Sequence, residues 1–413
     1  MKFGKVGQVG LVSAIALLVA TLFTACSTLT VGFLFVATTK QTPGQMEVYE
    51  VNSESGVLRT IPTSPFPSGG RDPIAEAVDV NTENLYVIND DDNNVVQFGI
   101  GTDGKLYPQS TVNTPGAFPL AVALNVADTF LYVVDTLGPQ AGCSLANPCP
   151  GDIAVYPVNS DGSLAAPVAH NTTYPNYWPL TISASNNTVL TPTAMNVVAN
   201  GHNVYVTAFN AATNQGYLFG FTANSDGTLT ELTLGCPAST PNCGVQPLSL
   251  GSEPVAMASD TGSQNLYVVD EKQNLIRGFS LASSGVPSLV STTATGDQPS
   301  ALTIFNDKFL YVTNSLDSTI TAYNVSAGSL SSFETYGTGT NPVAVTVDPR
   351  NIGFLYTVNF LGNSLSGYQI NPTNGTLVNT QASPYASSAQ PTAISGVPHG
   401  GTATSTSSSG TSK

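Results

Sequence analysis

The stretch QPSALTIFNDKFLYVTNSLDSTITAYNVSAGSL, residues 298–330, contains four short segments rich in β-branched and aromatic residues. Turns made of Asn, Asp, Gly and Ser separate the segments, such as Asn306-Asp307 before the second one. This alternation predicts four antiparallel strands joined as a meander. A sheet of this size has two apolar faces that it cannot bury alone, so we expect further copies of it in the chain.

Copies of this unit recur along the chain. The second strand aligns as Leu34-Phe35-Val36, Leu85-Tyr86-Val87, Leu131-Tyr132-Val133, Val204-Tyr205-Val206, Leu266-Tyr267-Val268, Leu310-Tyr311-Val312 and Leu355-Tyr356-Thr357. The turn before the fourth strand recurs as well, for example as Asp103-Gly104-Lys105-Leu106 and Asn374-Gly375-Thr376-Leu377. Two motifs that recur together at a spacing of about 45 residues indicate an internal structural repeat.

Seven repeats of four strands predict an all-β fold, a seven-bladed β-propeller of antiparallel blades. The first repeat lacks its own first strand, but Gln390–Ile394 matches Gln298–Leu302 near the other end of the chain. We therefore expect a C-terminal strand to join the first blade and close the ring. The propeller is predicted over residues 27–396. Residues 397–413 form a tail rich in Ser, Thr and Gly that is predicted to be disordered.

Residues 1–26 have the features of an export signal. Lys2 and Lys5 precede an apolar run, Val9–Phe23, and the segment ends at Cys26. A small residue before a single cysteine resembles the bacterial lipobox, which implies that Cys26 is acylated. An ordinary signal peptide and an uncleaved anchor are the alternatives. We expect an exported protein that is lipid-anchored in the bacterial cell envelope (periplasm or outer membrane) or secreted.

Insertions in the third to fifth repeats carry the other four cysteines. Cys143 and Cys149 lie close together in one insertion, and Cys236 and Cys243 lie close together in another. In an exported protein such pairs indicate two local disulfides. A shared metal site is the alternative, but these spacings are wider than those of thiolate metal ligands.

A third insertion holds Tyr174, Tyr177 and the only tryptophan, Trp178. These aromatic side chains suit contact with a carbohydrate or a protein, and we therefore predict binding loops here. The alternative is a buried connection between two blades.

The chain resembles the lactonase-type seven-bladed propellers, which include 6-phosphogluconolactonase-like, carboxymuconate-cyclase-like and YVTN-repeat proteins. The resemblance rests on Tyr311-Val312-Thr313-Asn314, on first strands of the form Pro-x-Ala and on Asp-Gly-x-Leu turns, and it covers roughly residues 32–396. It implies the propeller fold and a lactone hydrolase as one activity, although a fold alone does not fix a function.

Enzymes of that group are expected to use His, Arg and Glu at the mouth of the central channel. This chain has three histidines, His170, His202 and His399, and all of them fall in predicted loops or turns. The sequence therefore offers no histidine to take that role, and we expect all three to be exposed.

Other side chains near the start of the first strands are the catalytic candidates. Glu76 is the only charged residue within a first strand, and Arg71 is the basic residue nearest to it in sequence. Glu253 and Asp297 lie beside the first proline of two other repeats. A Glu76–Arg71 site could polarise a lactone or hold a polar ligand. The alternative is a structural ion pair, because a buried charge needs a partner.

Asp90, Asp92 and Asn94 form a short acidic run in a turn. Their spacing is that of the first ligands of a calcium loop, but Val95 replaces the required glycine. A solvated turn is therefore the favoured interpretation, and we predict neither a metal nor another cofactor.

Acidic residues outnumber basic ones. Removal of Lys2 and Lys5 with the signal segment would leave 9 basic and 26 acidic residues, a formal charge of −17. This excess argues against nucleic acid as a partner, and against a membrane contact other than the lipid anchor. It also disfavours a phosphorylated sugar as substrate.

Two functions remain. The favoured prediction is an envelope-anchored propeller, a monomer, that binds an unknown protein or carbohydrate ligand. The alternative is an extracytoplasmic lactone hydrolase that acts on a non-phosphorylated lactone.

Overall fold

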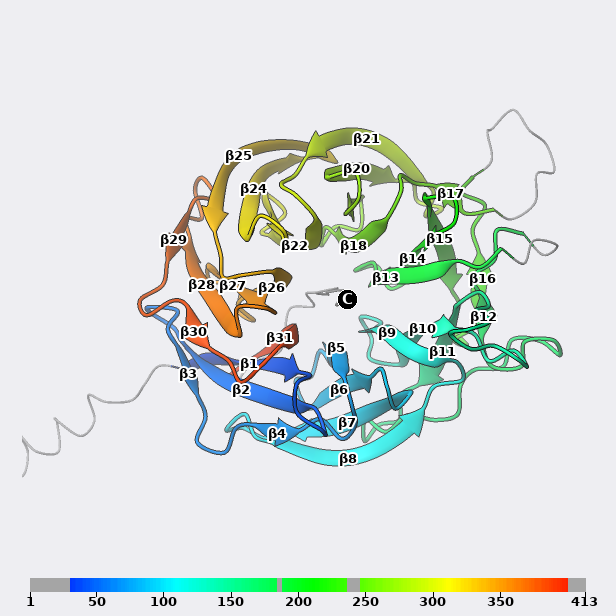
Figure 1. Ribbon diagram of the computed structural model, residues 1–413, viewed down its shortest axis with the longest axis horizontal. Coiled ribbons are helices and arrows are strands. Elements are labelled where there is room, and N and C mark those ends of the chain that lie inside the picture. Colours follow the sequence, from blue (N-terminus) through cyan, green and yellow to red (C-terminus); the bar gives the residue numbers. More distant parts are fainter. Residues whose placement is uncertain (1–29, 184–187, 236–245, 400–413) are drawn as a thin grey trace, which may run out of the picture.

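The computed structural model describes residues 30–183, 188–235 and 246–399 of the protein. These residues form seven antiparallel sheets set around a central axis, so the predicted seven-bladed propeller is confirmed (Figure 1). None of the described residues belongs to a helix long and apolar enough to cross a membrane.

The first four blades contain the strands up to β17. Their bounds are β1 (Thr30–Thr38), β2 (Gln45–Asn52), β3 (Leu58–Thr60) and β4 (Phe66–Pro67) in blade 1; β5 (Pro73–Val78), β6 (Asn84–Asn89), β7 (Asn94–Ile100) and β8 (Leu106–Asn113) in blade 2; β9 (Ala117–Leu124), β10 (Phe130–Leu137), β11 (Asp152–Pro157) and β12 (Trp178–Pro179) in blade 3; and β13 (Thr191–Val197), β14 (Asn203–Asn210), β15 (Gln215–Ala223), β16 (Leu229–Glu231) and β17 (Leu248–Ser249) in blade 4.

The last three blades and the closing strand complete the ring. Their bounds are β18 (Pro254–Ser259), β19 (Asn265–Asp270), β20 (Leu275–Leu281) and β21 (Pro287–Ala294) in blade 5; β22 (Pro299–Phe305), β23 (Phe309–Asn314), β24 (Thr319–Ser326) and β25 (Ser329–Gly337) in blade 6; β26 (Pro342–Val347), β27 (Phe354–Asn359), β28 (Ser364–Ile370), β29 (Leu377–Asn379) and β30 (Tyr385–Ala386) in blade 7; and β31 (Pro391–Pro398) in blade 1.

The C-terminal strand β31 closes the ring. It pairs with β1 in antiparallel register, with Phe35 opposite Ser395, and becomes the innermost strand of blade 1. In Figure 1, β31 lies beside the central axis together with β5, β9, β13, β18, β22 and β26. The predicted closure is therefore confirmed, and β31 extends to Pro398, just beyond the predicted end of the propeller.

Neighbouring blades are joined by the two motifs that define the repeat. The hydroxyl of Tyr311 on β23 donates a 2.7 Å hydrogen bond to the carbonyl of Gly375, in the turn before the fourth strand of blade 7. Tyr86 and Tyr356 make the same bond to the turns of blades 3 and 1. These tyrosines are fully buried, and a buried phenol needs a partner. The Tyr-Val and Asp-Gly motifs of these blades therefore recur together because they contact each other across the blade interface.

The inner strands pack alternate residues against the two adjoining blades. On β22, Ala301 clusters with Val345 of blade 7, whereas Leu302 clusters with Val269 of blade 5. The position of Leu302 is apolar in the other inner strands except β5: it is Val122, Met195, Met257, Val345 and Ile394. On β5 it is Glu76, which therefore points toward blade 1 from within the inner ring of strands.

Candidate functional site

The turns between second and third strands meet the linkers into the inner strands on one side of the ring. We call this side the loop face; it comprises turns 90–93, 271–274, 315–318 and 360–363 and linkers 68–72, 114–118, 251–253, 295–298 and 338–341. Backbone bonds join each turn to the linker of its own blade: the Glu271 amide donates to the Glu253 carbonyl, and the Ser315 amide to the Gln298 carbonyl. The loop face is therefore a hydrogen-bonded layer.

Asparagine side chains connect the loop face from blade to blade. The carboxamide oxygen of Asn274, at the end of a turn in blade 5, accepts the amide N–H of Gln298 in blade 6 at 2.9 Å. Asn93 and Phe118 repeat this contact between blades 2 and 3. All four residues have positive φ, which lets the turn and the linker approach closely. The residue before the inner-strand proline is thereby held in a defined place.

A hollow of about 390 Å³ lies on the loop face between blades 5 and 6. Its lining consists of Glu253, Glu271, Lys272, Asn274, Asp297, Gln298 and Leu316. The hollow combines three carboxyl groups, one ammonium group and two side-chain amides. Two of the four catalytic candidates predicted from the sequence, Glu253 and Asp297, therefore meet in one site, which we call the blade 5–6 hollow.

The buried carboxylate of Asp270 holds both loops of this hollow. It accepts the amide N–H groups of Ser252 at 2.7 Å and Glu253 at 3.3 Å from the linker, and that of Gln273 at 3.0 Å from the turn. The backbone of Gly251 packs directly against the same carboxylate. A Cβ atom at this position would lie 1.9 Å from an Asp270 oxygen, so only glycine fits there. One side chain thus sets the positions of Glu253 and of the turn that carries Lys272.

Arg277 balances the charge of Asp270. Its guanidinium lies 3.3 Å from the Asp270 carboxylate, and it also donates to the side-chain oxygen of Gln273. The amide of Gln273 in turn donates to the Ser252 hydroxyl at 3.1 Å, which links the turn to the linker. The Asp270 side chain is fully buried and that of Arg277 is 13% exposed, so water screens this ion pair only weakly.

Two further contacts orient groups inside the hollow. The amide nitrogen of Asn274 donates to the Asp297 carboxylate at 2.8 Å, and the Lys272 ammonium donates to the carboxamide oxygen of Asn214 in blade 4. Such a set can accept a proton from water, stabilise a negative oxygen and bind hydroxyl groups. A second hollow, of about 450 Å³, lies along β24 and β25, and its lining includes five Ser and Thr residues, Phe333 and the acidic residues Asp317 and Glu334. It offers no ammonium group, so we place the chemistry in the blade 5–6 hollow.

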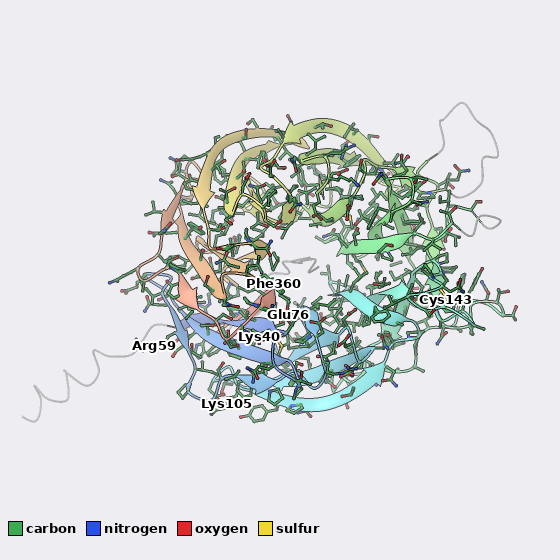
Figure 2. The ribbon with its side chains drawn as sticks, in the orientation of Figure 1. Lys40, Arg59, Glu76, Lys105, Cys143 and Phe360 are labelled. Atoms are coloured by element: carbon green, nitrogen blue, oxygen red, sulfur yellow. A yellow bond between two sulfur atoms is a disulfide. The ribbon has the colours of Figure 1, made fainter. Side chains whose placement is uncertain are left out.

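Glu76 lies apart from this hollow, on the inner side of the ring (Figure 2). Its side chain is 6% exposed, and neither carboxylate oxygen has a hydrogen bond of ordinary geometry. The polar group that interacts with it is Ser395 on β31. Burial raises the pKa of Glu76 to about 8, so the carboxyl is largely protonated at neutral pH.

Arg71 does not pair with Glu76. Its guanidinium lies 2.7 Å from Asp92 and 3.7 Å from Asp91, and its backbone N–H also donates to Asp92. These contacts hold the pKa of Asp92 below its usual range. Arg71 therefore stays in the linker, and the predicted Glu76–Arg71 site does not form.

Two of the three side chains of the acidic run in blade 2, those of Asp92 and Asn94, bind other residues of the protein. Asp92 binds Arg71, and the carboxamide oxygen of Asn94 accepts a hydrogen bond from Asn89 at 2.9 Å. Burial, with the charge of Asp72 as a second cause, raises the pKa of Asp90 to about 7. The described part of the chain contains no cluster of three or more His, Cys, Asp or Glu side chains that could hold a metal ion.

The aromatic insertion is largely a buried connection, not an exposed surface. Trp178 is 1% exposed, and its indole N–H donates to the carbonyl of Leu229 in blade 4 at 3.0 Å. Tyr177 is also buried, and only Tyr174 remains partly accessible. His170 stacks on Trp178 with ring centres 4.6 Å apart. Of the predicted binding loops, only Tyr174 can contact a ligand from solvent.

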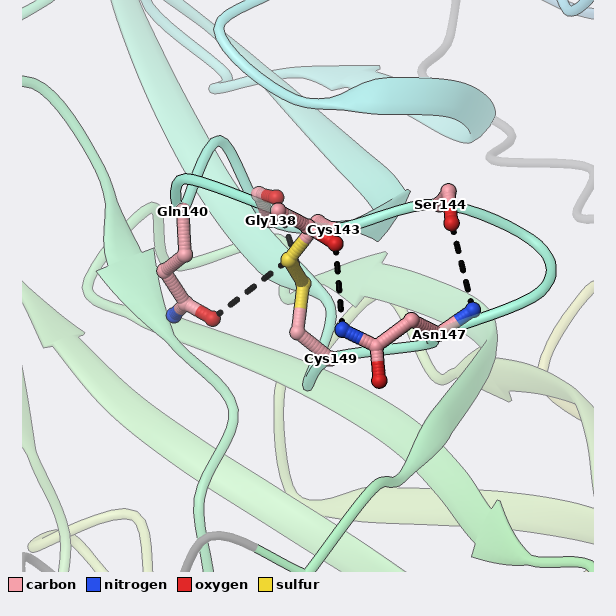
Figure 3. The surroundings of a disulfide bond; sticks show 7 residues. Gly138, Gln140, Cys143, Ser144, Asn147 and Cys149 are labelled. Carbon is pink, nitrogen blue, oxygen red and sulfur yellow. Dashed lines mark hydrogen bonds between the residues drawn. A yellow bond between two sulfur atoms is a disulfide. The ribbon is translucent and has the colours of Figure 1, made fainter.

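Cys143 and Cys149 form a disulfide in the loop between β10 and β11 (Figure 3). The carboxamide of Asn147 donates to the Gly142 carbonyl across this loop. The first predicted disulfide is therefore confirmed. Cys236, Cys243 and Cys26 lie outside the described residues. All three histidines are exposed, and none lies in the blade 5–6 hollow.

Sequence reasoning missed Asp270, Lys272 and Arg277. A signal was present, because blade 5 has Asp270 and Arg277 where blade 6 has Asn314 and Thr321. In blade 6 the Asn314 amide donates to Thr321, so an amide–hydroxyl contact is replaced by an ion pair in blade 5.

The seven antiparallel sheets set around one axis define a seven-bladed β-propeller. The chain belongs to the lactonase family of seven-bladed β-propellers, whose model matches residues 33–394. Comparison with curated proteins gives no match.

Several solved structures share this fold. A 6-phosphogluconolactonase candidate from Bacteroides fragilis is 18% identical, with a TM-score of 0.69 over 90% of this chain and 99% of that one. The periplasmic gluconolactonase PpgL of Pseudomonas aeruginosa is 17% identical, with a TM-score of 0.68 over 89% of this chain and 99% of that one. At these identities the likeness concerns the fold.

Proposed function

We propose that the protein hydrolyses a sugar-derived lactone in the blade 5–6 hollow. Membership of the lactonase family supports this activity over a pure binding role. The observation that carries the proposal is the meeting of Glu253 and Asp297 with Lys272 in one hollow of about 390 Å³. A cavity of that size is within the range of small-molecule sites.

In the proposed mechanism Glu253 is the general base. It takes a proton from water as the water oxygen attacks the lactone carbonyl carbon, and the carbonyl oxygen becomes negative. The Lys272 ammonium stabilises this oxyanion. The bond from the carbonyl carbon to the ring oxygen then breaks, and the ring oxygen takes the proton back from Glu253. The product is an open-chain hydroxy acid.

Glu253 suits this role better than Asp297. The Asp297 carboxylate is exposed to solvent. Glu253 is half-buried, and Asp270 fixes its backbone. Asn274 and Gln298 supply amides that can bind sugar hydroxyl groups.

The charge of the hollow favours a non-phosphorylated substrate. Three carboxyl groups against one ammonium would repel a phosphate.

The test is hydrolysis of glucono-1,5-lactone, measured by acid release above the spontaneous rate, with 6-phosphogluconolactone in parallel. We expect turnover of the first and little of the second. Glu253→Gln and Lys272→Met should each lower kcat by about 100-fold or more. Glu54→Gln, an exposed carboxyl in a turn before β3, is the matched control and should have no effect.

Absence of turnover on a panel of γ- and δ-lactones, with folded protein, would contradict the proposal. Full activity of Glu253→Gln would place the base elsewhere, and Asp297→Asn would then be the next variant.

We also propose that the protein is exported, acylated at Cys26, monomeric, and attached to the membrane by its lipid alone. The apolar segment ending at Cys26 supports this placement. Wild-type protein expressed in a Gram-negative host should partition into the detergent phase on detergent phase separation, and Cys26→Ala should not. Equal partitioning of both would contradict acylation at Cys26.

A further inference from the structure

Two aspartates face each other inside blade 3. Asp135 near the end of β10 is directly opposite Asp152 at the start of β11 in the antiparallel register. Both side chains are fully buried. The loop that joins them is the one closed by the Cys143–Cys149 disulfide, so the pair lies at the base of that loop.

Three of the four carboxyl oxygens have no hydrogen-bond partner. Both oxygens of Asp152 and one of Asp135 are buried without one, whereas the second oxygen of Asp135 accepts the Gly116 N–H at 2.9 Å. No ion pair formed by the described residues includes either aspartate. Two buried carboxylates without a cation would carry a large desolvation and repulsion cost.

The same place in other blades contains a hydrogen-bond donor. In blade 2 the Asn89 amide donates to Asn94 at 2.9 Å, and in blade 6 the Asn314 amide donates to Thr319 at 3.0 Å. Each of these pairs is opposite in register, as Asp135 and Asp152 are. Blade 3 therefore lacks a side-chain donor between these two strands at a position where blades 2 and 6 have one.

We propose that Asp135 and Asp152 share one proton at neutral pH, and that its loss at alkaline pH loosens the disulfide-closed loop. A protonated carboxyl supplies the missing donor, as O–H···O between the two side chains. Asp152 carries the proton, because the Gly116 N–H favours the ionised form of Asp135. Deprotonation places two like charges across the strands at the base of the loop.

The surroundings of the pair reinforce this assignment. Burial raises the pKa of Asp135 to about 7 and that of Asp152 well above its usual range. The titratable groups that interact with the pair are Asp90 of blade 2, Tyr156 on β11 and Tyr177 in the connection to blade 4. All three are acids, so none can neutralise a second negative charge.

A metal ion is the competing occupant. The described residues bring no third His, Cys, Asp or Glu side chain to the pair that could complete a metal site. Hard divalent cations in proteins take six or more oxygen ligands, so two carboxyls form a poor site. A shared proton needs only the two groups present.

The test follows stability and loop protection against pH. The folded pair binds one proton more than the unfolded chain between about pH 4 and the folded pKa, so stability falls as pH rises through this range. Asp135→Asn and Asp152→Asn each introduce into blade 3 a side-chain amide donor like that of Asn89 in blade 2. The fall in melting temperature from pH 6 to pH 9 should be at least about 2 °C smaller in both variants than in wild type.

Hydrogen exchange of residues 138–151 in wild type gives a second measurement. Corrected for the intrinsic pH dependence, protection should drop at least threefold between pH 6 and pH 9. Glu54→Gln should retain the wild-type behaviour in both experiments.

Wild-type pH slopes in both asparagine variants would overturn the proposal. If neither variant folds, wild-type protection that stays constant from pH 6 to pH 9 would overturn it as well. A rise in melting temperature with added Ca²⁺ or Mg²⁺ that Asp152→Asn abolishes would identify a metal site instead.

Discussion

Glu76 shows how one substitution in a repeat can create a titratable group in the core. Six of the seven inner strands carry an apolar residue at this position, and only β5 carries a carboxyl. The side chain does not pair with Arg71, which lies in a linker on the loop face and is held by Asp92. The result is a carboxyl between two blades that folding keeps protonated.

Stability should fall as pH rises through the range set by Glu76. Its folded pKa is about 8, above the ordinary value of 4.5, so the folded state binds an extra proton between these values. Each pH unit in that window should remove about 1.4 kcal/mol. Glu76→Gln should reduce this slope and be more stable than wild type at pH 8. Urea unfolding of both proteins at pH 5.5 and pH 8 measures this loss of stability. An equal loss in wild type and Glu76→Gln would show that Glu76 is not the group that titrates.

Asp270 is the positioning residue of the blade 5–6 hollow, because it holds the linker and the turn at once. Asp270→Asn removes the ion pair with Arg277 and weakens these bonds. We expect kcat for the lactone to fall by about 10- to 100-fold, with a smaller change in KM.

A readout independent of activity accompanies this prediction. Amides of residues 251–254 and 271–274 should exchange faster in Asp270→Asn, whereas those of 315–318 in blade 6 should not change. The double variant Asp270→Asn with Arg277→Met removes the unpaired charge; it should recover stability but keep the fast exchange. Unchanged exchange at 251–254 would show that Asp270 does not hold the linker.

At the level of single elements, the second-strand tyrosine and the turn before the fourth strand form one inter-blade contact. Tyr311→Phe leaves the buried Gly375 carbonyl without its donor, and should cost about 1–2 kcal/mol. Tyr107→Phe, whose ring is 50% exposed on β8, is the matched control. The denaturant midpoints of the two variants are compared with that of wild type. An equal change in both would show that the inter-blade hydrogen bond does not contribute to stability.

The elements also show why the fold was predictable and the site only partly so. The places of Tyr311 in a second strand and of Gly375 in a turn could be predicted because each belongs to a short motif that recurs in the sequence. Glu253 and Asp297 could be named because each lies beside an inner-strand proline. Lys272 could not, since it enters the hollow through a turn that contacts the linkers of its own blade and the next. Trp178 is buried because it packs against blade 4, and the sequence around Trp178 gives no indication of that contact.

For the whole molecule, ring closure is the interaction that spans the greatest sequence distance. Besides the pairing of β1 with β31, the buried Glu47 carboxylate on β2 accepts the Ser387 hydroxyl and the Ser388 amide, both at 2.6 Å. Thr392 on β31 donates to the Pro73 carbonyl of blade 2 at 2.7 Å. The last strand and the linker before it therefore connect blades 7, 1 and 2.

Deletion of residues 390–413 should open the ring. It removes β31 and leaves the inner edge of β1 without a partner, and an unpaired edge of this kind pairs with other chains. We expect loss of the cooperative melting transition, or oligomers in place of monomer, measured by light scattering after size-exclusion chromatography. Deletion of 400–413 alone spares every described strand and should retain the wild-type mass and melting temperature. A monomeric, cooperatively melting 390–413 deletion would show that six complete blades and an incomplete first blade suffice, and that closure by β31 is dispensable for the fold.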